Sequence, residues 1–187
     1  MRPEGVTAHV RFVPWARALE MGSRGEVPGI LSCARNADRE KYFLLSEPIS
    51  YAEFGFAALA SREVKKINHL SDADKYKVGS IIGYTSSTEL TDAGIEHDLS
   101  PTDRVALKKL EAGRIELLYS ELNTTRYLVK TELEGVNLKY FLMGKRAYHL
   151  CISKQWPDAQ SLLSMFNAGL AEIQADGTFD SIQRKYQ

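Results

Sequence analysis

Arg39 lies in a dense stretch of charge, "SCARNADREKYFLLSEPIS" (residues 32–50), which follows the apolar run "VPGIL". Residues 35–41 hold two arginines, a lysine, an aspartate and a glutamate. The planar guanidinium of arginine donates in parallel to both oxygens of a carboxylate, which makes Arg39 a candidate for binding an anion. The alternative is a solvated surface turn after a buried strand, and the residue types alone leave both interpretations open.

A second candidate for anion binding is "VGSIIGYTSSTEL" (residues 78–90), in which a strand ends at Gly83 and a helix begins among residues 86–88. The free backbone amides at the N-terminus of a helix attract anions. The hydroxyl groups of residues 86–88 offer the other interpretation, because serine and threonine commonly cap a helix with their own side chains.

Two further segments place functional residue types after predicted strands. "RIELLYSEL" (residues 114–122) puts Glu121 at the end of a strand, where its carboxylate either meets a cation or stabilises the start of the next helix. "VPWARAL" (residues 13–19) puts Trp15 and Arg17 just after the first predicted strand. Trp15 is either a core residue or an aromatic wall for a ligand.

Motifs of common catalytic and metal sites are absent from the sequence. The chain has no GxSxG, HExxH, GxxxxGKS or GxxxxGKT segment, its histidines lack the spacing of metal ligands, and its two cysteines form no CxxC. We therefore expect a protein that is not an enzyme and that uses no metal and no cofactor.

The composition is that of an ordinary globular protein with one domain or two small lobes. Of the 187 residues, 44% are apolar and 26% are charged, and 24 basic residues balance 24 acidic ones. Zero net charge argues against nucleic acid or an anionic membrane as the main partner. No apolar stretch reaches the roughly 18 residues of a membrane span, and the N-terminus lacks the apolar core of a signal peptide.

Hydrophobic patterning predicts strands that alternate with helices. The strict alternation in "VTAHVRFV" (residues 6–13) predicts a strand with one buried face. Further strands are expected at residues 27–33, 54–60, 77–83, 114–120 and 147–153, and helices at residues 14–25, 38–43, 86–94, 100–113, 121–133, 157–177 and 178–186. This order predicts the α/β class with mostly parallel sheets, which bind ligands at the carboxyl ends of their strands.

Two of the expected helices carry clear signals. Ser100 is expected to cap the helix at residues 100–113, with Pro101 in its first turn. The helix at residues 157–177 is amphipathic. Its buried stripe is expected to consist of Ala159, Leu162, Leu163, Phe166, Leu170 and Ile173.

Four segments in this order resemble bacterial extracellular solute-binding proteins of family 3, the polar amino-acid binding proteins of the periplasm. "GRIELLYSEL" resembles the family's GRxDxxxxD, and "NADREKYFLLSEPI" resembles TpeRxxxxxFSxPY. "VGSIIGYTSSTE" resembles VGvxxGTT, and "SLLSMFNAGLAEIQADGTFDSIQRKY" resembles the ending LaelkaDGTyxkIxxkY. "PWARAL" is similar to the PWxRal segment of a divergent branch.

The resemblance implies the two-lobed fold of type II periplasmic binding proteins, in which two α/β lobes close around a solute. Lobe 1 would hold residues 1–52 and 149–187, and lobe 2 would hold residues 53–148. The implied function is to capture a small carboxylate-bearing solute for an ABC-type uptake transporter, with a membrane permease as partner and the periplasm as location. A sensory or orphan ligand-binding module is the alternative, and an enzyme on this scaffold is a third hypothesis.

The resemblance also implies roles for residues at matching positions. Arg39 would grip the carboxylate of the ligand, and the turn at residues 83–85 would supply the other contacts of that carboxylate. Glu121 would bind an ammonium group, and Trp15 would stack on the ligand. The implied ligand-binding residues are Trp15, Arg17, Arg39, Gly83, Tyr84, Thr85 and Glu121.

The chain departs from the family pattern within this implied site. Asn36 replaces the usual threonine, Glu121 replaces the usual aspartate, and Tyr84 is bulky where a small hydroxyl residue is common. We therefore expect a small anionic or zwitterionic solute, without a choice among amino acids.

The start of lobe 1 is expected to lack the strand and helix that the family has before the segment matching residues 6–13. Three outcomes are open: the chain folds poorly alone, the flanking strands pair directly, or a second copy fills the gap in an intertwined homodimer. Cys33 and Cys151 fall on strands of this lobe that the family topology makes neighbours. Because free cysteine is commonly a small buried apolar residue, we expect two thiols rather than a disulfide.

Overall fold

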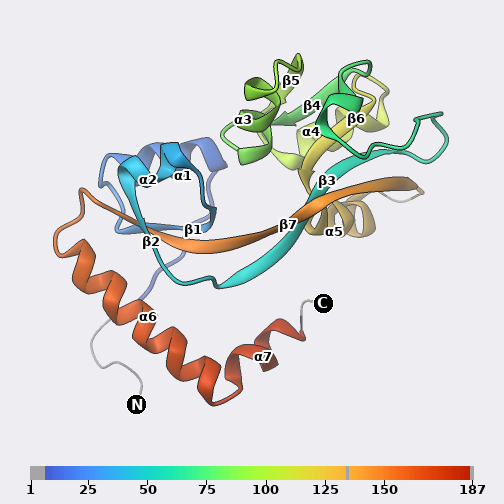
Figure 1. Ribbon diagram of the computed structural model, residues 1–187. Coiled ribbons are helices and arrows are strands. Elements are labelled where there is room, and N and C mark those ends of the chain that lie inside the picture. The colour runs from blue at the N-terminus through green and yellow to red at the C-terminus, as the bar shows by residue number, and fades with distance from the viewer. Residues whose placement is uncertain (1–6, 134, 186–187) are drawn as a thin grey trace. The chain divides into compact units, whose positions relative to one another are not determined.

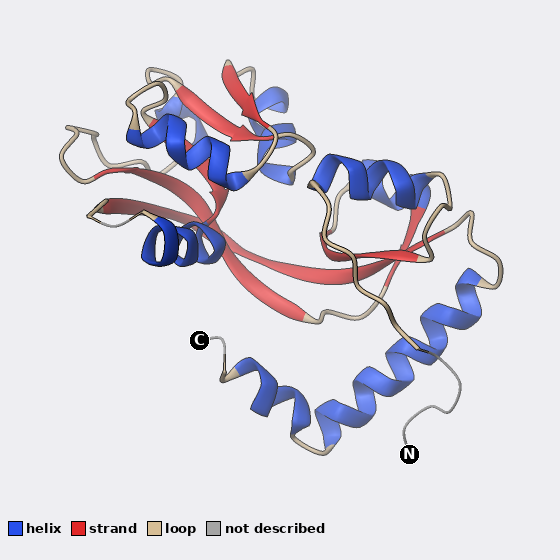
Figure 2. Cartoon of the chain, turned by 180° about the vertical axis from the view of Figure 1, so that it is seen from behind, coloured by secondary structure: helices blue, strands red, loops and turns tan. Residues whose placement is uncertain are grey.

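The computed structural model describes residues 7–133 and 135–185, and its helices alternate with strands as the sequence predicts (Figures 1 and 2). Its helices are α1 (Trp15–Ser23), α2 (Ala37–Tyr42), α3 (Thr85–Asp92), α4 (Asp103–Glu111), α5 (Leu122–Glu132), α6 (Ala159–Ala175) and α7 (Thr178–Gln183), with a 3-10 turn at Leu70–Ala73. Its strands are β1 (Gly29–Ala34), β2 (Phe43–Leu45), β3 (Ser50–Leu59), β4 (Val78–Ile81), β5 (His97–Ser100), β6 (Leu117–Glu121) and β7 (Leu138–Ser153). The α/β class is confirmed.

Contacts between residues divide the chain into two compact units. Unit 1 comprises the described parts of Met1–Val13, Arg17–Tyr51 and Ala147–Gln187, and unit 2 comprises Pro14–Ala16 and Ala52–Arg146. Two of the boundaries fall inside β3 and β7, so each of these long strands contributes residues to both units.

Unit 1 is built on the C-terminal part of β7, which pairs antiparallel with β1 and with β2. The register places Ile30 opposite Cys151 and Leu44 opposite Ile152. Ile30, Ile152 and Phe43 are each at most 5% exposed, and they form part of the core of this unit.

Residues 7–14 do not form the strand that their alternation predicts, because they lie in neither a helix nor a strand. Val10 is 64% exposed and Phe12 is 93% exposed, so the apolar face of this segment is not buried. An isolated strand gains neither ladder hydrogen bonds nor a buried face, and alternation alone does not supply a partner. β1 stands at the end of the strand order. Direct pairing of residues 7–13 with β1, one of the three outcomes considered, is therefore wrong.

Cys33 on β1 and Cys151 on β7 form a disulfide, so the expectation of two free thiols is wrong. Both cysteines are fully buried, and their Cα atoms lie 6.0 Å apart, within the usual range for a bridge. The pairing of β1 with β7 puts Cys33 opposite His149 and Ile30 opposite Cys151, which brings the two sulfurs together across the ladder. The positions of the two cysteines in the sequence do not predict this register, and so they do not predict the bridge.

Unit 2 contains the parallel part of the sheet. β4 pairs parallel with both β5 and β6, whereas β3 pairs antiparallel with β6. Among the pairings described, parallel pairing is confined to these two neighbours of β4, so the expectation of mostly parallel sheets is wrong. The strand order β3-β6-β4-β5 places the carboxyl ends of β4, β5 and β6 at one edge.

Both faces of the unit 2 sheet are buried. Phe56 and Ala58 of β3 pack in one cluster with Leu90 of α3, and Ala57 packs on the other face with Leu107 of α4. A strand buried on both faces reads as a continuous apolar run, as "FGFAALA" does. β3 also approaches β7 closely, because a β-carbon on Gly55 would collide with the carbonyl oxygen of Phe141.

Several predicted boundaries differ from the structure. The side chain of Thr102, and not that of Ser100, caps α4 by accepting a hydrogen bond from the amide of Val105. Ser100 instead ends β5, a short strand that the sequence did not predict. β7 begins at Leu138, nine residues before the predicted strand at 147–153.

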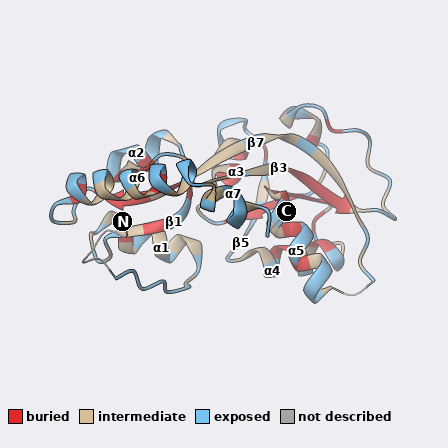
Figure 3. Ribbon diagram, turned by 90° about the horizontal axis from the view of Figure 1, so that it is seen from below, coloured by how far each residue is buried: buried red, intermediate tan, exposed pale blue. Residues whose placement is uncertain are grey.

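α6 is less buried than its amphipathic pattern predicts. Within its expected stripe only Ala159 and Leu170 are buried, and the other members are half-buried. In Figure 3 most of α6 has the colours of intermediate and exposed residues. Within the described parts of the chain, no helix combines the length and the apolar character needed to cross a membrane.

Removal of the disulfide should lower the free energy of unfolding, because the bridge restricts the unfolded chain across a sequence separation of 118 residues. We expect the double variant Cys33→Ala/Cys151→Ala to lose about 2–4 kcal/mol in urea unfolding. A thiol titration of the wild-type protein in denaturant without reductant is the control and should find no thiol. Two reactive thiols per chain, with an unchanged unfolding midpoint in the double variant, would contradict the bridge.

Candidate functional site

The three predicted turn residues, Gly83, Tyr84 and Thr85, follow the end of β4 at Ile81 after one intervening residue. Gly83 has a φ of 78°, a left-handed conformation that glycine adopts without strain. The amide of Tyr84 donates to the carbonyl of Ile81 at 3.1 Å, which closes the turn. Thr85 is then the first residue of α3. The turn therefore presents the N-terminus of a helix at the carboxyl edge of the sheet.

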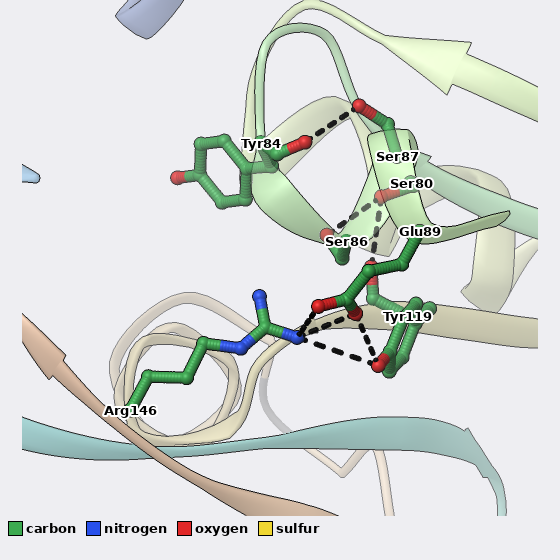
Figure 4. A network of polar contacts seen from close by, with 7 residues as sticks. All are labelled: Ser80, Tyr84, Ser86, Ser87, Glu89, Tyr119 and Arg146. Carbon is green, nitrogen blue, oxygen red and sulfur yellow. Dashed lines mark hydrogen bonds and ion pairs between the residues drawn. The ribbon is translucent and has the colours of Figure 1, made fainter. Parts of the chain in front are cut away.

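Among the residues that the structure describes, no side chain caps the N-terminus of α3, so the self-capping interpretation is wrong. The hydroxyl of Ser86 pairs with that of Ser80 at 2.9 Å, and Ser87 donates to the carbonyl of Tyr84 at 2.8 Å (Figure 4). Among the described residues, the amides of Thr85 and Ser86 have no acceptor, and the buried hydroxyl of Thr85 has no partner. These three donors can serve an anion.

Asp103, at the start of α4, holds the side chain of Tyr84. The Tyr84 hydroxyl donates to Oδ2 of Asp103 at 2.7 Å, whereas Oδ1 is buried without a partner among the described residues. Burial raises the pKa of the Asp103 carboxyl, and the hydrogen bond from Tyr84 opposes that shift. Sequence reasoning did not find this contact. The contact depends on β5, a strand that the sequence did not predict. Ser100 of β5 pairs with Ile81, which brings the start of α4 beside the turn.

Glu121 ends β6 and caps α5. Its carboxylate accepts hydrogen bonds from the amides of Asn123 at 2.6 Å and Thr124 at 2.9 Å, and also from the hydroxyl of Thr124. This is the helix-start interpretation of the sequence. The contact with an ammonium group stays a prediction.

Arg39 lies on α2 in unit 1 and is 6% exposed. Its guanidinium reaches back to the carboxyl end of β1, where it donates to the carbonyl of Ala34. Asn36, in the place of the usual threonine, caps α2 by accepting a hydrogen bond from the amide of Arg39 at 2.8 Å. The surface-turn interpretation suits Arg35, which is exposed and paired with Glu40, but not Arg39.

Trp15 and Arg17 both lie on α1 but have different surroundings. Trp15 is half-buried, and its indole Nε1 donates to the carbonyl of Gly83 at 3.0 Å. Trp15 and Gly83 both belong to unit 2. Arg17 belongs to unit 1, and its side chain is exposed. The structure thus joins Trp15 to the turn at residues 83–85.

Ionisation of Asp103 should make the protein less stable as the pH rises. Because the folded-state pKa lies above the ordinary value of 3.8, the native chain holds this proton more tightly than the unfolded chain does. The free energy of unfolding therefore falls as the pH rises from about 4 through the raised pKa.

Asp103→Asn tests this pKa shift, because the amide keeps an acceptor for Tyr84 and removes the charge. The free energy of unfolding of the variant relative to the wild type should be more favourable at about pH 7 than at about pH 4. Urea unfolding of both proteins at the two pH values measures it. An equal difference at both would contradict a raised pKa.

Comparisons with known proteins identify the family of the chain and its fold. The model of the bacterial extracellular solute-binding proteins, family 3, matches residues 2–187. No curated protein matches the sequence.

Several solved structures share the fold. The sensor domain of a histidine kinase, described as similar to periplasmic binding proteins, is 20% identical with a TM-score of 0.83, covering 92% of this chain and 75% of that one. An ancestral arginine-binding protein bound to glutamine is 21% identical with a TM-score of 0.79, covering 92% of this chain and 76% of that one.

A third similar structure is an arginine transport system periplasmic binding protein from Legionella pneumophila. It is 16% identical with a TM-score of 0.79, and the match covers 95% of this chain and 80% of that one. At these identities the three structures show likeness of fold alone, and they confirm the predicted periplasmic binding protein-like fold. Because the family model spans nearly the whole sequence, the chain belongs to family 3 of the bacterial extracellular solute-binding proteins.

Proposed function

We propose that this protein captures a small carboxylate-bearing solute of the amino-acid kind. The observation that carries the proposal is the uncapped start of α3, where two amides and the buried hydroxyl of Thr85 lack partners among the described residues. A buried hydroxyl without a partner costs about 1–3 kcal/mol, so a solute oxygen that accepts from it would recover that energy. A carboxylate also gains from the positive end of the helix dipole.

Arg39 is the second residue proposed to contact a carboxylate. Its side chain is buried at the carboxyl end of a strand, where α/β proteins commonly bind ligands. Trp15, which is hydrogen-bonded to Gly83, is proposed as an aromatic wall, and Arg17 as an exposed and less direct contact. Glu121 is proposed to bind the ammonium group of the solute. Its carboxylate would then accept hydrogen bonds from the ammonium group and from the amides of α5 that it caps.

The proposed setting is the periplasm, with delivery of the solute to the permease of an ABC-type transporter. A buried disulfide in unit 1 supports an oxidising compartment. The Legionella transport protein supports delivery, and the histidine kinase sensor domain supports the second candidate function, a ligand-binding module that signals. A permease-dependent uptake assay separates the two. We further propose that the bound solute is not turned over, and a homodimer stays a prediction.

A thermal-shift screen of amino acids and small organic acids tests solute capture. A solute at one hundred times its dissociation constant should add about 2.7 kcal/mol to the free energy of unfolding. We expect L-amino acids to raise the melting temperature more than their decarboxylated amines do, because the amines lack the group that the start of α3 would bind. Equal responses to acids and amines would contradict the proposal.

Arg39→Ala should weaken binding of the solute found in that screen by about 2–5 kcal/mol, because a buried charge pair would lose one partner. Arg35→Ala is the matched control, since Arg35 lies four residues away and is 62% exposed, and it should leave the affinity unchanged. Calorimetric titration measures both. If Arg39→Ala folds and binds as tightly as the wild type, Arg39 is not the anion contact.

A further inference from the structure

Arg146 lies in a cluster of four side chains inside unit 2. Its guanidinium carbon lies 3.6 Å from the centre of the Phe54 ring. Its Nη2 donates to the two carboxylate oxygens of Glu89 at 2.7 Å and 2.5 Å (Figure 4). Tyr119 donates its hydroxyl to the same carboxylate at 2.7 Å. The four side chains come from β7, β3, α3 and β6, so the cluster ties one helix to three strands.

The cluster is more buried than an ordinary surface ion pair. The side chain of Arg146 is 14% exposed and that of Glu89 is 35% exposed, while Tyr119 is 2% exposed. Burial, with the Glu89 carboxylate beside it, raises the pKa of Tyr119 far above its ordinary value, so its hydroxyl stays a donor. A guanidinium stacked on an aromatic ring and paired with a carboxylate away from water holds its geometry better than an exposed pair does.

Glu89 connects this cluster to the start of α3. It lies four residues after Thr85, and residues at that spacing share one face of a helix. The first turn is held separately, because Ser86 pairs with Ser80, which in turn donates to the carbonyl of Tyr119 at 2.9 Å. Two attachments one turn apart define the direction in which a helix of eight residues points its free amides.

Arg146 is also the last residue of unit 2 before β7 continues into unit 1 at Ala147. The same side chain therefore anchors the strand at the boundary of the unit and the helix that presents the amides. A displacement of β7 at this boundary would pull on Glu89 and hence on α3.

We propose that Arg146 is a positioning residue for solute binding. Through Glu89 it fixes the start of α3 against β7 at the unit boundary, and it sets the affinity for the solute without touching it. This inference rests on the proposed function. It gives a role in solute binding to Arg146, for which the sequence alone predicted none.

The first test needs no solute. The indole N–H of Trp15 donates to the carbonyl of Gly83, so its NMR resonance reports the position of the turn. Trp156→Phe identifies that resonance, because the chain has two tryptophans. Arg146→Gln and Glu89→Gln should both shift it and should both speed amide hydrogen exchange in α3. A variant that merely unfolds more easily would keep the native resonance well below its melting temperature.

Arg62→Gln is the matched control, because within the same unit Arg62 forms an ion pair at 3.1 Å with Glu116, the residue before β6. It should leave both the Trp15 resonance and α3 exchange unchanged. If Arg146→Gln fails to fold, Glu89→Gln and Arg146→Lys take its place, since lysine keeps the charge but loses the planar stack on Phe54. Unaltered resonance and exchange in the folded variants would overturn the proposal.

The second test is calorimetric titration with L-glutamine and with L-arginine. Arg146→Gln and Glu89→Gln should each weaken binding by about 3- to 30-fold, and the double variant should lose no more than either one. Weaker binding in Arg146→Gln with wild-type affinity in Glu89→Gln would mean that Arg146 contacts the solute directly, and would overturn the proposal. If the wild type binds nothing in the screen, solute capture fails, while the solute-free test still decides whether Arg146 positions α3.

Discussion

Parallel pairing of β4 with both β5 and β6 is the constraint on which the candidate site in unit 2 depends. Parallel strands bring their carboxyl ends to one edge of a sheet, and each of these three strands is followed there by a helix start. The turn at residues 83–85, Asp103 and Glu121 are far apart in sequence but share this edge. Without the parallel register they would not be neighbours.

The three helix starts at this edge are not equivalent. Thr102 caps α4 and Glu121 caps α5, each by accepting hydrogen bonds from amides of its own helix. α3 alone of the three has no side-chain cap, and its first hydroxyl is buried without a partner among the described residues. At α4 and α5 a side chain therefore already occupies the helix start, whereas among the described residues none does so at α3.

Much of the fold could be predicted because its strands carry local signals. The apolar runs at β4 and β6 are buried on both faces or nearly so, and their composition identifies them without knowledge of their partners. β5 was missed because "HDLS" is short, polar and half exposed, so only its pairing with β4 makes it a strand. The strand predicted at residues 7–13 is wrong for the opposite reason. Its pattern alternates well, but among the described residues the segment has no partner strand with which to pair. The Cys33–Cys151 bridge and the Tyr84–Asp103 contact depend on register between distant segments, which no local pattern reports.

Solute capture as proposed requires that the free donors at the start of α3 bind the carboxylate of the solute. Amide NMR of the ¹⁵N-labelled protein, titrated with the L-amino acid that gives the largest thermal shift, tests it most directly. If the carboxylate binds there, the amide resonances of Thr85 and Ser86 shift downfield and saturate with the same dissociation constant as calorimetry reports. Saturable binding that leaves both resonances where they stand in the solute-free protein would contradict it.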